Sequence, residues 1–204
     1  NGLRSPGRTD DGGPAMTRAL VVYSHPCDDS FVAAVRDHTF DALRGAGAEV
    51  RLDDLYADGF DPCFSAEERR EHRRPGAHPS LDRWVENLRW CDTLVLVYPT
   101  WWAGQPAMLK GWIDRVWACE VAWTVPEGAD RLRPHLRNVR RLVAITTHGS
   151  PKHINMLEGE GGKRTLTRSL RTMCHPLART TWLAMYGLDN ATPGERAKFL
   201  DRVE

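Results

Sequence analysis

The stretch TLVLVYPTWWAGQPAMLKGWIDRVW, residues 93–117, decides the fold of this chain. Residues 93–98 are apolar without alternation, which is typical of a strand whose two faces are both covered. The loop 99–104 follows, and Pro106 favours the start of a helix over 106–117. The apolar stripe of that helix, at a spacing of three, one and three, consists of Leu109, Trp112, Ile113 and Val116. The segment therefore predicts a buried strand, a tight loop and a helix that packs on the sheet.

The rest of the chain repeats this alternation of strand and helix. Further strands are expected at 19–23, 49–53, 142–147 and 179–186, and further helices at 30–44, 81–90, 162–174 and 193–203. Residues 54–78 form a polar excursion, and residues 118–139 look irregular. Five strands that alternate with helices predict an α/β fold, a doubly wound parallel sheet in three layers, α/β/α.

Composition restricts the class of protein. A length of 204 residues predicts one domain. The 28 basic and 27 acidic residues balance, which argues against nucleic acid as the main partner and favours a small-molecule site. Five scattered cysteines without a CxxC pair give no support for a metal site and fit a reducing cytoplasm. Apolar runs of about five residues are too short to cross a bilayer.

Residues 1–15 differ from the rest in composition. They are rich in Gly, Arg, Asp and Pro and lack the apolar core of a secretory signal. We expect them to be a disordered extension or a cloning remnant, and residues 16–204 to form the domain.

Three loops mark the expected binding site. Open parallel sheets bind ligands beyond the carboxyl ends of their strands, where the strand order reverses. Loops 24–31, 99–104 and 147–155 follow three of the strands. The first lacks GxGxxG, yet it ends at a helix N-terminus that favours an anion, to which His25 and Ser30 can add hydrogen bonds. The alternative is that Ser30 is only a helix cap and His25 only a turn residue.

The second loop carries two adjacent tryptophans, Trp101 and Trp102. Two such side chains at the end of a parallel strand need a flat partner, and a flavin ring is the partner that we expect. Backbone amides of this loop can then donate to the polar edge of the ring, where negative charge collects when a flavin is reduced. The alternative is that both tryptophans belong to the core.

The third loop combines small residues with two histidines. Gly149 allows the backbone to approach a planar ligand closely. His148 and His153 lie on either side of Lys152 and could contact the ring edge, the phosphates or a quinone oxygen. The alternative is that they are ordinary surface residues.

These segments together resemble the flavodoxin-like NAD(P)H:quinone oxidoreductases over roughly residues 17–190. The resemblance rests on residues 21–26 with Ser30 and Phe31, on 54–56, on 99–116 with its LKGW, and on 145–149. It implies the strand order 2-1-3-4-5 and a two-electron flavoenzyme. In such an enzyme a reduced nicotinamide gives a hydride to flavin N5, and a quinone or similar acceptor then takes it in a ping-pong cycle.

The resemblance also implies the partners and the site. It implies a cytoplasmic homodimer with FMN or FAD as cofactor, NAD(P)H as co-substrate, and active sites at the subunit interface. The residues carried over for the flavin are His25, Ser30, Phe31, Pro99, Thr100, Trp101, Trp102, Thr146, Thr147, His148 and Gly149. Trp123 and His148 are carried over for the acceptor pocket.

Two departures from the family stand out. The Tyr and His that assist charge relay in the family fall on Ile154 and Glu160 here, so His153 is the candidate substitute. Of an aromatic pair that lines the acceptor pocket, Trp123 fills the first position and Val125 the second. These departures leave open a non-catalytic regulatory subunit that binds flavin or nucleotide.

Overall fold

A five-stranded parallel sheet forms the centre of the molecule. The computed structural model describes residues 16–204, so the expectation for residues 1–15 lies outside the described part. The strands are β1 (Arg18–Tyr23), β2 (Glu49–Asp54), β3 (Thr93–Pro99), β6 (Arg141–His148) and β7 (Arg179–Tyr186). Their order is β2-β1-β3-β6-β7, and every neighbouring pair is parallel. The predicted order 2-1-3-4-5 and the predicted fold class are confirmed.

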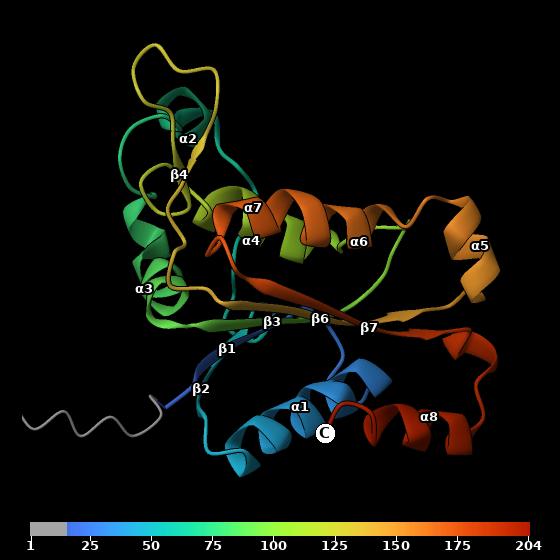
Figure 1. The fold of residues 1–204 in the computed structure, drawn as a ribbon. Helices are drawn as coiled ribbons and strands as arrows, with labels where there is room; N and C mark the ends of the chain where they lie inside the picture. Colours follow the sequence, from blue (N-terminus) through green and yellow to red (C-terminus); the bar gives the residue numbers. More distant parts are fainter. Residues whose placement is uncertain (1–15) are drawn as a thin grey trace, which may run out of the picture.

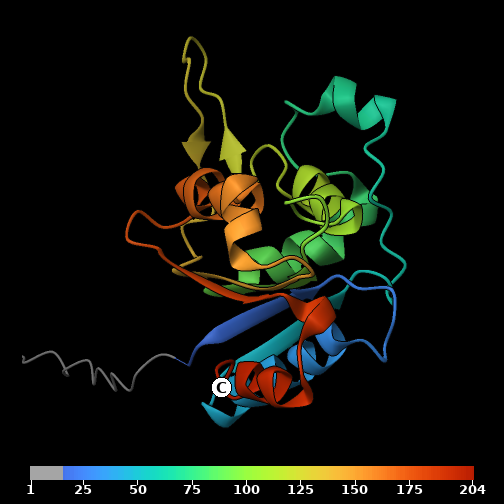
Figure 2. The same ribbon diagram turned by 90° about the vertical axis from the view of Figure 1, so that its right-hand side faces the viewer.

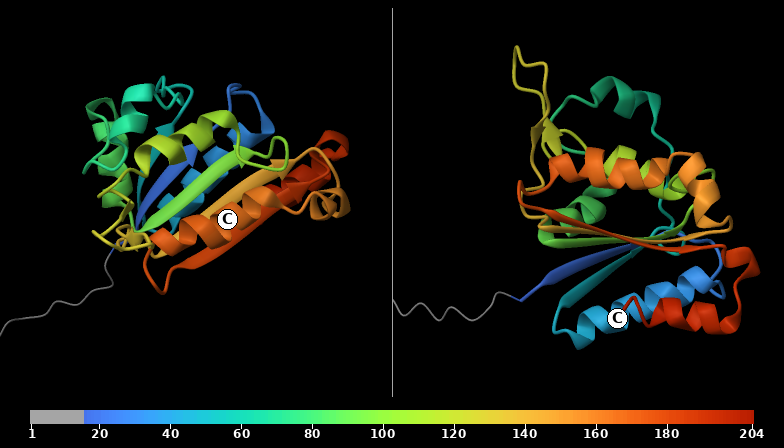
Figure 3. Two further views of the ribbon diagram at one scale, coloured as in Figure 1. Left: turned by 90° about the horizontal axis from the view of Figure 1, so that it is seen from above. Right: turned by 45° about the vertical axis from the view of Figure 1, so that its right-hand side comes forward.

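Helices cover both faces of the sheet (Figure 1). On one face lie α1 (Phe31–Gly45) and α8 (Pro193–Leu200). On the other lie α3 (Asp82–Trp90), α4 (Ala107–Val116) and a segment that runs through α6 (Gly161–Arg164), η2 (Thr165–Leu170) and α7 (Arg171–Met173). The right-hand view of Figure 3 shows the sheet between the two helical layers again, and the left-hand view looks down on the helices of one face. Among residues 16–204, no helix is both long and apolar enough to cross a bilayer.

Shorter elements lie outside the sheet and its main helices, and some of them differ from the elements expected from the sequence. The excursion 54–78 contains α2 (Ala66–Glu71), and residues 118–139 contain a small hairpin of β4 (Trp123–Thr124) and β5 (Arg133–Pro134). Both project from the same side of the molecule (Figure 2). The helix expected over 162–174 is helical from 161 to 173, but η2 in its middle is a π-helix. The remaining elements are η1 (Pro79–Leu81), α5 (Lys152–Leu157) and η3 (Leu188–Asn190).

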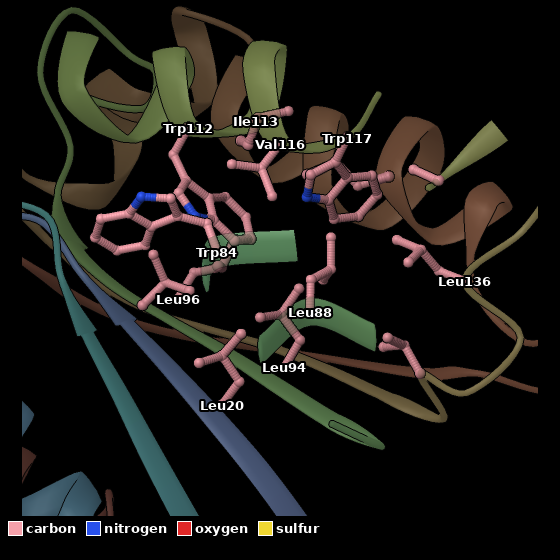
Figure 4. Packing of buried hydrophobic residues seen from close by; sticks show 14 of the residues in the cluster. Leu20, Trp84, Leu88, Leu94, Leu96, Trp112, Ile113, Val116, Trp117 and Leu136 are labelled. Atoms are coloured by element: carbon pink, nitrogen blue, oxygen red, sulfur yellow. The ribbon is translucent and has the colours of Figure 1, made fainter. Parts of the chain in front are cut away.

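The core explains why β3 carries no polar alternation. All seven of its residues are buried, because one apolar layer lies on each face of the sheet. On the α3–α4 side, Trp84, Trp112 and Trp117 pack with leucines from the strands and from α3 (Figure 4). The predicted stripe of the helix over 106–117 is confirmed, since its four members are buried here. Burial of this aromatic surface holds α4, and with it the loop before α4, in a fixed position.

Gly111 lies in the middle of α4, where glycine is normally unfavourable. A Cβ built on Gly111 would lie 2.5 Å from the Cα and from the carbonyl oxygen of Pro62. The segment before α2 therefore passes directly over the helix at this point. Only a residue without a side chain allows that approach, which accounts for the glycine of the LKGW segment.

We expect Gly111→Ala to destabilise the protein by roughly 1–3 kcal/mol, because the backbone at Pro62 must shift to admit a methyl group. The matched control is Gly194→Ala in α8, where a Cβ would meet nothing within 4 Å. That change is expected to stabilise the protein by roughly 0.4–1 kcal/mol. Urea unfolding of both variants provides the measurement, and equal effects at the two glycines would contradict the packing argument.

Candidate functional site at the carboxyl edge of the sheet

A cleft opens where the carboxyl ends of β1, β3 and β6 meet. Its volume is about 580 Å³, and its lining comes from all three predicted loops and from the segment after β7. The lining residues are His25, Ser30, Phe31, Val32, Pro99, Thr100, Trp101, Trp102, Thr147, Gly149, Leu188 and Asp189. The strand order reverses between β1 and β3, so the cleft lies at the switch point at which such sheets bind ligands.

Strand register brings the loops together. Pro99 of β3 lies opposite Thr147 of β6, and the amide of Thr100 donates to the carbonyl of Thr147 at 2.7 Å. The amide of Ser24 donates to the carbonyl of Val97 at 3.0 Å. Because these bonds extend the ladders past the strand ends, the three loops start from one rigid edge.

Part of the cleft wall is the N-terminus of α1. Ser30 caps this helix, since its Oγ accepts from the amide of Ala33 at 3.1 Å. The amides of Phe31 and Val32 belong to the first turn, where N–H groups have no partner within a helix, and both residues line the cleft. His25 is a turn residue as well, because its Nδ1 accepts from the amide of Cys27 at 3.0 Å. Ser30 is thus a helix cap and His25 a turn residue, and both also line the cleft in which an anion is expected.

Another part of the cleft wall is a strained turn, in which the centroid of the Trp101 ring lies 6.4 Å from that of the His25 ring. Trp101 and Gly104 exchange backbone hydrogen bonds of 3.2 and 3.1 Å, and the two residues between them, Trp102 and Ala103, have left-handed φ values of 50° and 58°. Such a conformation costs roughly 1–2 kcal/mol per residue outside glycine. The turn leaves Trp101 43% exposed and Trp102 fully exposed. The alternative that both tryptophans belong to the core is therefore wrong.

The third loop contributes backbone and buried hydroxyl groups. Thr146 and Thr147 are buried, and Thr147 reaches the cleft. Gly149 is closely covered, because a Cβ there would lie 2.5 Å from Oδ2 of Asp189. His148 is buried beside the cleft, in the wall of a smaller hollow.

Two of the expected site residues lie elsewhere in the single chain. Trp123 is on β4, where its Nε1 donates to the carbonyl of Trp117 at 2.7 Å, and it lines two other cavities. His153 is exposed in the first turn of α5 and lines none of the cavities described here. The structure thus separates both of them from the cleft.

Five residues in or beside the cleft were not expected from the sequence. Val32, Leu188 and Asp189 line it, and Asn155 and Tyr186 contact His148. Leu188, Asp189 and Tyr186 come from the end of β7 and the turn after it, and that segment has no motif of its own. Only the pairing of β7 with β6 places it against the third loop.

The cleft fits a flavin nucleotide. It joins a helix N-terminus with free amides to a wall of backbone and tryptophan, which matches a molecule that carries both a phosphate and a flat ring. Within the described lining, His25 and Asp189 are the titratable side chains, and neither Lys nor Arg takes part. Backbone amides and the dipole of α1, with His25, are therefore the groups that would hold phosphate.

A family described as having a flavodoxin-like fold matches residues 17–203. The chain belongs to this family. Two relatives extend the match. NAD(P)H dehydrogenase (quinone) 1 of Cavia porcellus is 30% identical over 153 residues, which are 67% of this chain and 55% of the relative. The uncharacterized NAD(P)H oxidoreductase YcaK of Escherichia coli (strain K12) is 30% identical over 159 residues, which are 77% of this chain and 76% of the relative. The chain thus matches little more than half the length of the mammalian relative.

Solved structures agree with this assignment. Smu.1420 from Streptococcus mutans UA159 superimposes with a TM-score of 0.79 at 28% identity, covering 92% of this chain and 96% of that one. The NAD(P)H:quinone oxidoreductase from Methanothermobacter marburgensis reaches a TM-score of 0.76 at 23% identity, covering 93% and 96%, and supports the fold alone. The predicted family is confirmed.

Proposed function

We propose that this flavodoxin-like protein is an NAD(P)H-dependent flavin oxidoreductase that acts on a quinone or a related acceptor. The observation that carries the proposal is the cleft itself, in which the N-terminus of α1 and the loop 99–104 face one cavity at the switch point. The two relatives, whose alignments cover 67% and 77% of this chain, are both named as NAD(P)H-dependent redox enzymes, which supports the proposal. When bound, a flavin would accept a hydride at N5 from NAD(P)H and pass it to the acceptor in a ping-pong cycle.

The chain's own residues have the following roles in this proposal. Ser30, Phe31 and His25 hold the phosphate, while the backbone of residues 99–102 and 147–149 borders the ring. Thr147 and Gly149 present no bulky side chain to the cleft, and the glycine also makes room for the carboxylate of Asp189. In the single chain the cleft is open beside Trp102, which is fully exposed.

A homodimer is part of the same proposal. Trp102 is fully exposed, and Trp123 lines a separate cavity in the single chain. A second copy that covers the cleft would bury Trp102 and could bring its own Trp123 to the acceptor side. Light scattering on the purified protein tests this, and a monomer that still turns over NAD(P)H would contradict the shared site. We also propose a cytoplasmic location, which the scattered cysteines favour.

The deciding experiment is spectroscopic. The purified chain is titrated with FMN and with FAD, and NADPH or NADH is then added without oxygen. We expect a bound visible spectrum that bleaches with the nicotinamide and returns with a quinone. A protein that binds neither flavin contradicts the proposal. Binding without bleaching favours a non-catalytic flavin-binding subunit, which is consistent with Ile154 and Glu160 in place of the family's Tyr and His.

Trp102→Ala is expected to weaken flavin binding by between about twofold and about tenfold, since one aromatic stacking contact contributes roughly 0.5–1.5 kcal/mol. Quenching of flavin fluorescence gives the Kd. Leu177→Ala is the control, because Leu177 is an exposed apolar side chain that lines none of the cavities described here. An unchanged Kd in Trp102→Ala would remove this tryptophan from the proposed site.

A further inference from the structure

A hydrogen-bonded cluster centred on His148 lies behind the cleft. His148, at the end of β6, is 5% exposed and forms the wall of a hollow of about 210 Å³. The hollow adjoins the cleft, since Thr100, Trp102 and Gly149 line both. A buried imidazole beside a ligand cleft is a candidate for binding a proton, so its partners decide what it can do.

Asn155 fixes the tautomer of this imidazole. The Nδ2 of Asn155 donates to the carbonyls of Ser150 and Pro151, at 3.1 and 3.0 Å, which assigns the amide nitrogen to that side. Its Oδ1 therefore faces Nδ1 of His148 at 2.6 Å and must accept a hydrogen there. A neutral His148 thus carries its proton on Nδ1, and its Nε2 presents a lone pair.

The lone pair of His148 points along a chain of hydroxyl groups. Oγ1 of Thr100 lies 3.3 Å from Nε2 of His148 and 2.8 Å from Oγ1 of Thr146. Because Nε2 can only accept, Thr100 donates to it, and Thr146 donates to Thr100. The Thr100 hydroxyl is therefore turned toward the histidine while the imidazole is neutral, although Thr100 also lines the cleft.

The surroundings keep His148 neutral but allow it to charge. Burial lowers its pKa, while the hydrogen bond to Asn155 and the carboxylates of Glu160 and Glu158 act in the opposite direction. Tyr186 stacks on the ring with centroids 4.5 Å apart and donates its hydroxyl to Glu160 at 2.9 Å. Glu160 is also paired with Lys163 at 3.1 Å. Added negative charge in the cleft would favour the imidazolium form, because opposite charges raise the proton affinity of a base.

We propose that His148 is the proton-binding residue of this cleft and that Thr100 connects it to the bound flavin, an inference that rests on the proposed function. One proton from water binds to the lone pair on Nε2, and no covalent bond of the protein breaks. The Nε2–H then donates to Oγ1 of Thr100, which releases the hydroxyl hydrogen of Thr100 to donate into the cleft. Removal of the electrons reverses each step, and the proton returns to water.

This assignment differs from the one expected from the sequence. His153 is one residue from the position of the family's tyrosine, yet it is exposed and lies outside the hollow. His148 is buried, has a fixed tautomer and is connected to the cleft. The two histidines can be told apart by separate substitutions.

The first test uses the flavin-free protein. Nitrogen-15 spectra of its labelled histidines are expected to show the Nδ1–H tautomer for one buried histidine. This histidine should stay neutral at pH values below the usual pKa of the imidazole. The signal is assigned by its loss in His148→Gln. The Nε2–H tautomer at His148 would overturn the proposal.

The second test uses protein loaded with FMN or FAD and reduced chemically with dithionite, so that no turnover is needed. Reduction is expected to raise the proton affinity of His148 at least tenfold. In the pH range where His148 takes up this proton, the midpoint potential of the wild type should fall more steeply with pH than that of His148→Gln. The difference corresponds to one proton per two electrons, or about 30 mV for each tenfold change in proton concentration. His38→Gln, on α1 and away from the cleft, is the control.

Thr100 is tested by a matched pair of variants. Thr100→Val keeps the shape but removes the hydroxyl, and it is expected to reduce the response of His148 to flavin reduction, whereas Thr100→Ser is expected to retain it. A wild-type slope in His148→Gln, or loss of the slope in His153→Gln instead, would overturn the proposal and leave the proposed function intact. Failure of the wild-type chain to bind flavin would overturn both. If His148→Gln does not fold, the histidine spectra of the oxidised and reduced wild-type protein decide.

Discussion

Asp53→Asn is expected to stabilise the protein at pH 8 by up to about 4 kcal/mol and to leave its stability at pH 4 nearly unchanged. Asp53 lies at the end of β2, wholly buried, and its Oδ1 accepts from Nδ2 of Asn87 at 2.7 Å, while its Oδ2 has no partner. Burial raises the pKa of this carboxyl to about 7, although Asn87 and two nearby arginines oppose the shift. Ionised Asp53 is therefore costly, and asparagine keeps the shape without the charge.

The expected pH window follows from this raised pKa. Below pH 4 the carboxyl is protonated in both the folded and the unfolded chain, so it costs nothing. As the pH rises toward 7, the unfolded chain ionises first and the folded state loses about 1.4 kcal/mol per pH unit. Above pH 7 the loss is constant. The difference in free energy of unfolding between Asp53→Asn and the wild type should therefore grow between about pH 4 and pH 7.

Urea unfolding from pH 4 to pH 8 measures this difference. Asp41→Asn is the matched control, since Asp41 is exposed on α1 and should give parallel curves at every pH. Parallel curves for Asp53→Asn as well would mean that water reaches this carboxyl in the folded protein.

Arg115→Met is expected to destabilise the protein by roughly 3–5 kcal/mol, because it leaves a carboxylate buried without its cation. Nε of Arg115 donates to Oε1 of Glu68 at 2.8 Å, and the two side chains are only 7% and 9% exposed. Nη1 of Arg115 also donates to the carbonyl of Asp61. This arginine thus ties α2 and the segment before it to α4.

Glu68 also caps a helix, which decides the substitution that can restore stability to Arg115→Met. It closes a capping box with Ser65 at the start of α2. Burial by itself would raise the pKa of Glu68, but the amide of Ser65 and the guanidinium of Arg115 outweigh that effect and lower it. Glutamine at this position can still complete the capping box without a charge. The double variant Arg115→Met with Glu68→Gln should therefore recover part of the lost stability.

Arg70→Met is the control for the loss of a cation from α2, because Arg70 is exposed. We expect it to change the free energy of unfolding by no more than about 0.5 kcal/mol. A loss below about 1 kcal/mol in Arg115→Met, or no recovery in the double variant, would show that Glu68 is solvated once its partner is gone.

Local pattern was enough to predict much of the architecture. The unbroken apolar run 93–98 predicted the fully buried β3, and the stripe of the following helix predicted the packing face of α4. The three loops at the switch point were predicted because parallel strands end at one edge. The π-helix at η2 and the β4–β5 hairpin were missed, since both are set by packing rather than by local propensity.

The sequence by itself determined the fold, the edge of the sheet at which the cleft lies, and most of the residues around it. Periodicity and loop position carry that information, since each is a property of neighbouring residues. Tertiary structure alone decided that Trp102 faces outward on a strained turn and that His148, rather than His153, is buried beside the cleft. It also decided that Asp53 and Asn87, which are 34 positions apart, share one buried hydrogen bond. Such contacts join distant segments, so no local pattern encodes them.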